Sequence, residues 1–116
     1  ACHARARRSE DTDWAAIAAL YARLMVVAPS PVVALNRAVA VSRAEGAAVG
    51  LPLVDALMDE ARLRGYAPLH AVRGDLLQQL QRVDEARVAF ERAAALTGNA
   101  RERALLLARA ASCDKD

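Results

Sequence analysis

The chain has 116 residues, of which 55% are hydrophobic but only 3% aromatic, so Ala, Leu and Val must build its core. Such small side chains suit closely packed helices, whereas β-sheets favour aromatic and β-branched residues. The net charge of +2 comes from interspersed charges and does not indicate a polyanionic partner, and no apolar run approaches the ~18 residues of a membrane span. We therefore expect one cytoplasmic, all-α domain without a membrane partner.

Seven helices are predicted in chain order. They cover residues 1–8, 12–28, 32–44, 52–64, 68–81, 84–98 and 100–112. The first reads as the end of a helix that starts upstream, and Ala1 in place of Met indicates a piece cut from a longer chain. We expect residues 1–116 to form a single helical-repeat domain of that longer protein.

Capping residues mark several of the predicted helix starts. The polar stretch 9–13 offers N-caps to the second helix, and Ser30 with Pro31 can cap and open the third. Asn99, with Glu102 three residues later, resembles a capping box for the last helix. Apolar faces then follow at steps of three and four: Trp14, Ile17, Ala18, Tyr21, Leu24, Met25 and Ala28 in the second helix, and Leu35, Ala38, Val39 and Ser42 in the third.

The middle of the chain is more ambiguous. Residues 32–44 contain a Val-Ala-Val run that could mimic a strand, although helix is the favoured interpretation. Gly46 and Gly50 are expected to break this helix, and Pro52 to open the next one, which ends near Arg64.

The hairpin between residues 68 and 98 organises the chain. Gly74 and Ala86 lie 12 residues apart on opposite helices, where a side chain larger than methyl would hold the two backbones apart. Phe90 and Ala93 follow Ala86 at steps of four and three on one helical face, and Leu77 is the apolar contact of the first helix. This pattern resembles a tetratricopeptide repeat, whose period is about 34 residues.

Small residues recur at nearly this period. Ala38 precedes Gly74 by 36 residues and Ala108 follows it by 34, while Gly50 and Val54 depart from the strict repeat pattern. Hairpins of this kind bury a continuous core only when they are stacked. The predicted fold is therefore a tetratricopeptide-like stack of antiparallel helical hairpins, a right-handed α-solenoid fragment with six to seven helices.

No constellation of residues indicates catalysis. His3 and His70 are the imidazoles, and His70 is more simply a packed histidine than a ligand or general base. Cys2 and Cys113 lie at opposite ends of the chain without zinc spacing, and we expect two reduced thiols. The glycines of 46–50 lack the Lys-Ser/Thr of a phosphate loop. No catalytic, cofactor-binding or metal-binding residue is expected, and no cofactor.

Polar residues on the first helix of each hairpin could line a concave face that holds a peptide, although a solvated face with local ion pairs explains each of them singly. These candidate groove residues are Asn36, Arg43, Asp75, Gln78, Gln79 and Arg101. The run Arg5, Arg7 and Arg8 could touch nucleic acid, but a solvated helix end is the simpler interpretation.

Arg37 and Arg73 recur at a position that the repeat usually fills with an apolar residue. Buried stems with their heads paired to carboxylates would explain them without a ligand. The predicted partners are Asp75, Glu85 and Glu91.

Four segments carry a more specific resemblance: 34–41 (ALNRAVAV), 72–77 (VRGDLL), 86–94 (ARVAFERAA) and 99–107 (NARERALLL), with Trp14 and 29–31 (PSP). Together they resemble the tetratricopeptide-like C-terminal extension of a group of bacterial extracytoplasmic-function (ECF) sigma factors. The likeness covers essentially all 116 residues, and sigma regions 2 and 4 are absent from them. The resemblance implies a regulatory module that stands in place of a separate anti-sigma protein, and it brings no catalytic or ligand residues.

Two functions from different classes follow as expectations. The first is a non-catalytic regulatory domain that modulates transcription initiation through contacts with the sigma regions or core RNA polymerase, and meets DNA only through the missing sigma regions. The second is an adaptor that binds an external peptide or partner protein in its concave groove. A homodimer is a further expectation, because cutting a stack of repeats exposes its apolar end.

Overall fold

Helix is the regular structure throughout residues 12–113, which are the residues that this computed structural model describes. Six α-helices and one short 3-10 helix follow one another there, and the described residues contain no strand. The elements are α2 (Trp14–Val27), α3 (Pro31–Glu45), α4 (Ala47–Ala56), η1 (Ala61–Leu63), α5 (Ala67–Gln79), α6 (Val83–Leu96) and α7 (Ala100–Cys113). The prediction of an all-α chain is confirmed for these residues, while the predicted helix over 1–8 lies outside them.

Local capping signals place several helix starts where the sequence predicts them. The Asp13 carboxylate accepts a hydrogen bond from a backbone N–H in the first turn of α2 at 3.0 Å, and the Asn99 side chain accepts one from the Glu102 N–H at 2.9 Å. Pro31 occupies the first turn of α3 as predicted. Ser30 holds the N-cap position of α3, but its side chain makes no capping hydrogen bond, so that part of the prediction is wrong.

The predicted helix over 52–64 is wrong at both ends. Gly46 has a φ of +104°, which lets this one residue turn the chain, and α4 begins directly after it. Gly50 therefore lies inside α4, and Pro52 is an exposed residue of the same helix, where its missing N–H removes one helical hydrogen bond. Beyond α4 the chain continues through turns and η1.

Equivalent positions of the two central hairpins are buried together. Three pairs lie 36 residues apart and all six residues are buried: Ala38 and Gly74, Gly50 and Ala86, and Val54 and Phe90. Ala108, the third predicted member of the small-residue series, is exposed, because no described helix follows α7 to cover it. The repeat pattern thus identifies core positions in α3–α6 and fails in α7.

Gly74 allows α5 to approach the largest side chain of the core. A Cβ on Gly74 would lie 2.8 Å from Cε1 and 2.9 Å from Cδ1 of Phe90, whose side chain is fully buried. Ala86, the residue predicted to oppose Gly74, is buried in the same core, but the nearest atoms to Gly74 belong to the ring of Phe90. A side chain at residue 74 would therefore displace an aromatic ring before it met the opposite backbone.

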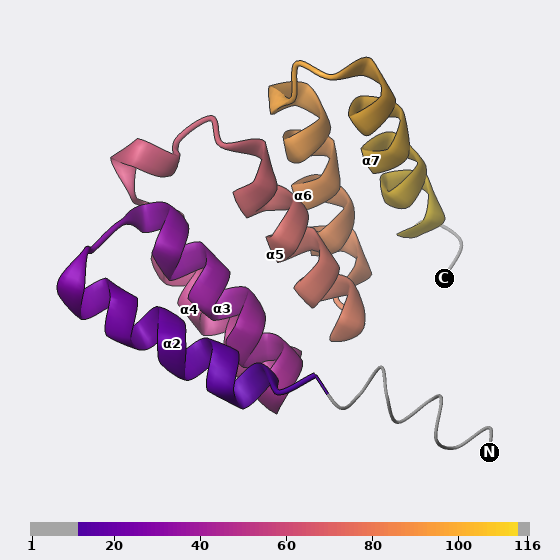
Figure 1. Cartoon of the computed structure of the whole chain (residues 1–116). Helices are drawn as coiled ribbons and strands as arrows, with labels where there is room; N and C mark the ends of the chain where they lie inside the picture. The colour runs from indigo at the N-terminus through magenta and orange to yellow at the C-terminus, as the bar shows by residue number, and fades with distance from the viewer. Residues whose placement is uncertain (1–11, 114–116) are drawn as a thin grey trace.

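Each helix packs mainly against its neighbours in sequence. Figure 1 shows α2, α3 and α4 grouped together and α5, α6 and α7 grouped together. The seam between the groups, formed by α4 and α5, is the slightest of the interfaces between successive helices. The chain therefore consists of two helical groups joined through η1 and a narrow seam.

The first helix of the described chain is the least covered. None of the residues of α2 is buried, and Leu20, Val26 and Val27 are 60%, 83% and 81% exposed. Most of the predicted inner face of α2 is half-buried, but Leu24 and Ala28 are exposed. α2 therefore presents an apolar outer face at one end of the helical array.

Candidate functional site

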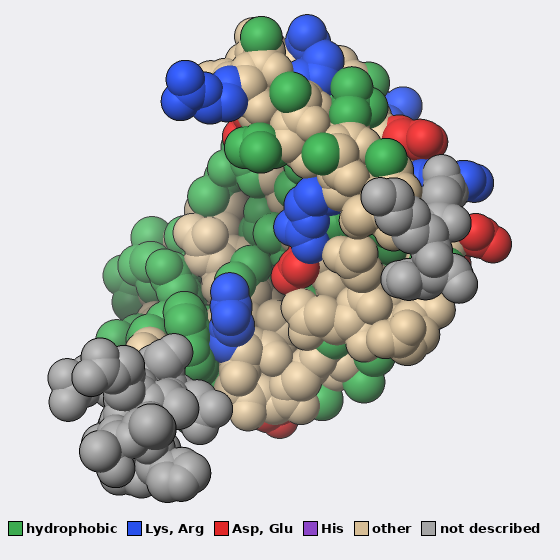
Figure 2. Space-filling view, turned by 90° about the vertical axis from the view of Figure 1, so that its right-hand side faces the viewer, with side chains coloured by type: hydrophobic (Ala, Val, Ile, Leu, Met, Phe, Trp, Pro, Cys, Tyr) green, Lys and Arg blue, Asp and Glu red, His purple; other side chains and the backbone are tan. Residues whose placement is uncertain are grey.

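A cleft of about 480 Å³ is lined by side chains of α3, α5 and α7. Figure 2 shows hydrophobic side chains over the left and upper parts of one face of the molecule, with basic and acidic side chains close together near its middle and other charged side chains around its edges. The cleft is lined by Val39, Ser42 and Arg43 of α3, by Ala71, Val72, Asp75, Leu76 and Gln79 of α5, and by Arg109 of α7. This mixture of apolar and charged groups suits a polypeptide better than a purely ionic ligand.

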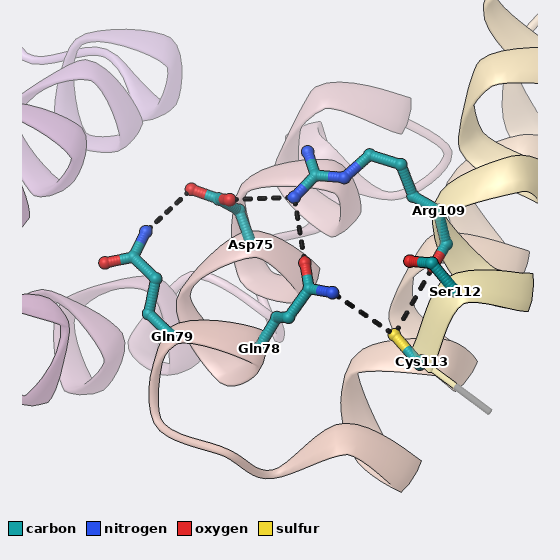
Figure 3. Close-up of polar contacts among 6 residues, drawn as sticks. All are labelled: Asp75, Gln78, Gln79, Arg109, Ser112 and Cys113. Carbon is teal, nitrogen blue, oxygen red and sulfur yellow. Dashed lines mark hydrogen bonds and ion pairs between the residues drawn. The ribbon is translucent and has the colours of Figure 1, made fainter. Parts of the chain in front are cut away.

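Arg109 joins α7 to α5 at the edge of the cleft. Its guanidinium donates to the Asp75 carboxylate at 2.9 Å and to the Gln78 side-chain oxygen at 3.0 Å. Figure 3 shows Arg109 reaching from α7 towards these two side chains of α5. The guanidinium carbon also lies 4.5 Å from the centroid of the Phe90 ring, a cation–π distance. Arg109 is therefore held by an ion pair, a hydrogen bond and a ring contact at once.

Further contacts order the α5 side of this network. Gln79 donates to Asp75 at 2.9 Å, and the Gln78 amide nitrogen lies 3.9 Å from the Cys113 sulfur (Figure 3). The side chains of Asp75 and Arg109 remain 42% and 46% exposed, so water and an incoming chain can both reach them. An exposed pair of this kind contributes no more than about 1 kcal/mol to stability and can be exchanged for a partner's charges.

The structure brings together four of the six predicted groove residues. Arg43, Asp75 and Gln79 line the cleft, Gln78 joins them through Arg109, and Arg43 also lies 5.6 Å from the Trp14 ring centroid.

Asn36 and Arg101 are exposed and do not line the cleft. Arg101 comes eight residues before Arg109, which places it roughly 12 Å further along α7. Asn36 and Arg101 therefore belong to helices that line the cleft, α3 and α7, but they lie at other positions along those helices.

Arg109 is the charged residue of the cleft that the sequence interpretation missed. It follows Asp75 by 34 residues, the same separation that links Ala108 to Gly74, and that separation does not mark a buried position in α7. Its reach across two helices depends on a long side chain and could not be read from the pattern of apolar residues.

The predicted partners of the recurring arginines are wrong. Arg73 is half-buried and pairs with Asp55 of α4 at 2.8 Å, because its side of α5 faces α4. Asp75 is engaged by Arg109 instead, and Glu85 pairs with its neighbour Arg82 at 2.7 Å. Arg37 is also half-buried, but it makes no ion pair within the described residues. Glu91 is exposed and pairs with neither arginine.

His70 is half-buried on α5, and burial together with the positive charges of Arg92 and Arg73 lowers the pKa of its imidazole. Cys113 is buried, and its thiol donates to the Arg109 carbonyl at 3.4 Å. Cys2, His3 and the arginines at 5, 7 and 8 lie outside the described residues.

Within residues 12–113, no three His, Cys, Asp or Glu side chains are arranged to hold a metal ion. A bilayer-crossing helix is likewise not found in that part of the chain, where none combines the necessary length and apolar character.

The chain is similar to one curated protein, the uncharacterized protein R00370 of Rhizobium meliloti (strain 1021). The two are 54% identical over 106 residues, which cover 91% of this chain. The chain spans about a quarter of that relative's length. No protein-family model matches the chain, and no solved structure matches it.

Proposed function

We propose that this chain is a non-catalytic regulatory domain of an ECF sigma factor, which modulates transcription initiation through contacts with the sigma regions or core RNA polymerase. The observation that carries the proposal is the cleft across α3, α5 and α7, because it offers a polypeptide an apolar floor with charges of both signs. In this proposal the two central hairpins are tetratricopeptide-like units of a right-handed stack, and the first helix of each unit faces the partner.

The similarity to the Rhizobium protein is compatible with an attached domain. Three quarters of that protein lies outside the matched segment, which leaves room for further domains in the same chain. A domain tethered to its target binds at high effective concentration, so it needs only a modest interface such as this open cleft. Two of the four segments that resemble the sigma-factor extension, 34–41 and 72–77, contain residues that line the cleft.

The test is transcription from the factor's own promoter by the full-length protein. Arg109→Glu places a negative charge beside Asp75 and should change promoter output several-fold, as should deletion of the whole domain. Arg101→Glu is the matched control, because it makes the same change on the same helix outside the cleft and should leave output unchanged. Circular dichroism of each variant checks that the helices are retained. Unchanged output in both the Arg109 variant and the deletion would refute the proposal.

The open cleft also favours a second candidate, an adaptor that captures an external peptide or partner protein. That function predicts binding by the isolated 116 residues, weakened by Arg43→Glu and unaffected by Asn36→Ala, since Arg43 lines the cleft and Asn36 does not. The two candidates separate in the reporter experiment: an adaptor for an external protein leaves purified polymerase and sigma factor unaffected by the Arg109 change.

A further inference from the structure

A second cavity of about 480 Å³ lies where the segment around η1 meets the start of α5 and the middle of α6. It uses a different face of α5 from the cleft: Leu69, His70 and Arg73 line it, whereas Ala71, Val72 and Asp75 line the cleft. Its volume is within the range of small-molecule sites. Nothing in the proposed regulatory function requires this cavity.

The charges that line the cavity are mostly positive and only partly neutralised. Arg64, Arg73 and Arg92 contribute guanidinium groups, and Asp59 contributes a carboxylate. Arg73 is paired with Asp55, but Arg64 and Arg92 make no ion pair within the described residues. Both side chains are exposed. Two guanidinium groups are therefore available to an incoming anion.

The rest of the lining is apolar. Met58 and Val88 line the cavity and are 38% and 57% exposed, while Leu63 and Leu69 form the buried floor. A ligand that covers Met58 and Val88 would remove this apolar surface from water, which is favourable in proportion to the area covered. The cavity thus combines unpaired cations with exposed hydrophobic side chains.

We propose that this cavity binds a small organic oxyanion, a carboxylate or phosphate monoester carried on an apolar body. Arg64 and Arg92 hold the anionic head, because the planar guanidinium donates two parallel hydrogen bonds to carboxylate or phosphate oxygens. Met58 and Val88 cover the apolar body. His70 lies beside the head and reports on it, since an anion that offsets Arg92 and Arg73 raises the lowered pKa of the imidazole.

The experiment follows the His70 ring by NMR while the 116-residue chain is titrated with phenyl phosphate, phenylacetate, inorganic phosphate or benzyl alcohol at constant ionic strength. His70→Gln assigns the signal against that of His3. We expect a saturable shift and a raised His70 pKa with at least one aromatic anion, weaker binding of inorganic phosphate, and none of benzyl alcohol. Comparison of phenyl phosphate with phenylacetate identifies the preferred head, and equal binding marks a site for both.

Arg92→Gln should weaken binding of the aromatic anion roughly tenfold, the cost of losing a charge-assisted hydrogen bond. Arg101→Gln, the same change at an exposed arginine outside the cavity, should bind as the parent chain does. The proposal is overturned if neither aromatic anion gives a saturable shift at millimolar concentration, if sodium chloride or benzyl alcohol reproduces it, or if the Arg92 variant binds unchanged. None of these results bears on the promoter experiment, which probes the other face of α5.

Discussion

Gly50 is the position where one added methyl group should cost the fold most. A Cβ at this residue of α4 would lie 2.4 Å from the Cβ of Ser42, 3.0 Å from its Cα and 3.2 Å from the carbonyl oxygen of Ala38. These atoms belong to the backbone of α3 or are bonded directly to it, so no rotamer change can move them away. Gly50→Ala therefore requires α3 and α4 to separate.

The size of the effect follows from two opposing contributions. Carbon atoms in good contact lie about 3.5–4.0 Å apart, so the helices must open by roughly 1 Å at this point. Overpacking of this kind costs about 1–3 kcal/mol and occasionally more. Replacing glycine by alanine inside a helix by itself stabilises the helix by about 1 kcal/mol. Because a contact of 2.4 Å against atoms fixed to the backbone is severe, we take the upper end of that range, about 3 kcal/mol. Subtracting the gain leaves a net destabilisation of about 2 kcal/mol, or a fall in melting temperature of roughly 8 °C for a domain of this size.

Urea unfolding followed by far-UV circular dichroism measures the change. Gly98→Ala is the matched control, because a Cβ there meets nothing within 4 Å, and it should leave stability unchanged or slightly higher. In the double variant Ser42→Gly/Gly50→Ala the 2.4 Å contact is gone, so the loss from Gly50→Ala should be smaller than in the parent background, a coupling above about 0.5 kcal/mol. A Gly50→Ala chain as stable as the parent, or a cycle without coupling, would refute the close-approach argument.

Two further predictions concern α5. Gln81 follows this helix with a φ of +64°, a left-handed conformation that glycine adopts without strain. In this turn the N–H of Arg82 donates to the Leu77 carbonyl and the N–H of Gln81 donates to the Gln78 carbonyl. Gln81→Gly should therefore raise the free energy of unfolding by about 1 kcal/mol, and an unchanged urea midpoint would contradict this. His70 faces Arg92, Arg73, Arg64 and Asp59, and the pKa of its imidazole is lowered in the folded chain. As pH falls, the imidazole is therefore protonated more readily in the unfolded chain than in the folded chain. The free energy of unfolding should decrease as pH drops below about 6.5, and the decrease should be smaller in His70→Gln.

Local signals made several helix starts predictable, because Asp13, Pro31 and Asn99 act on the backbone within a few residues of themselves. The buried small residues of α3–α6 were also accessible, since a spacing of 36 residues connects Gly50 to Ala86. The sequence alone could not distinguish a glycine that ends a helix from a glycine that lets two helices approach closely. Gly46 turns the chain and Gly50 admits a neighbouring helix, and only the packing of α3 on α4 distinguishes them.

The partners of long charged side chains were beyond the sequence pattern. Arg73 and Asp75 stand two residues apart on α5, yet one reaches back to α4 and the other receives Arg109 from α7. Helical spacing indicates which face a residue occupies, but the partner depends on which helix covers that face. The cleft residues were predicted only in part for the same reason. The repeat pattern indicated which helices line the cleft, but it did not indicate which positions along those helices reach it.

The narrow seam between α4 and α5 has a mechanical consequence. The cleft is lined by α3 on one side of that seam and by α5 and α7 on the other, so a polypeptide bound in it would contact both helical groups. Relative tilting of the groups would change the width of the cleft, and occupation would restrain the tilting. Binding in the cleft and the rigidity of the two helical groups relative to each other would in this way be coupled.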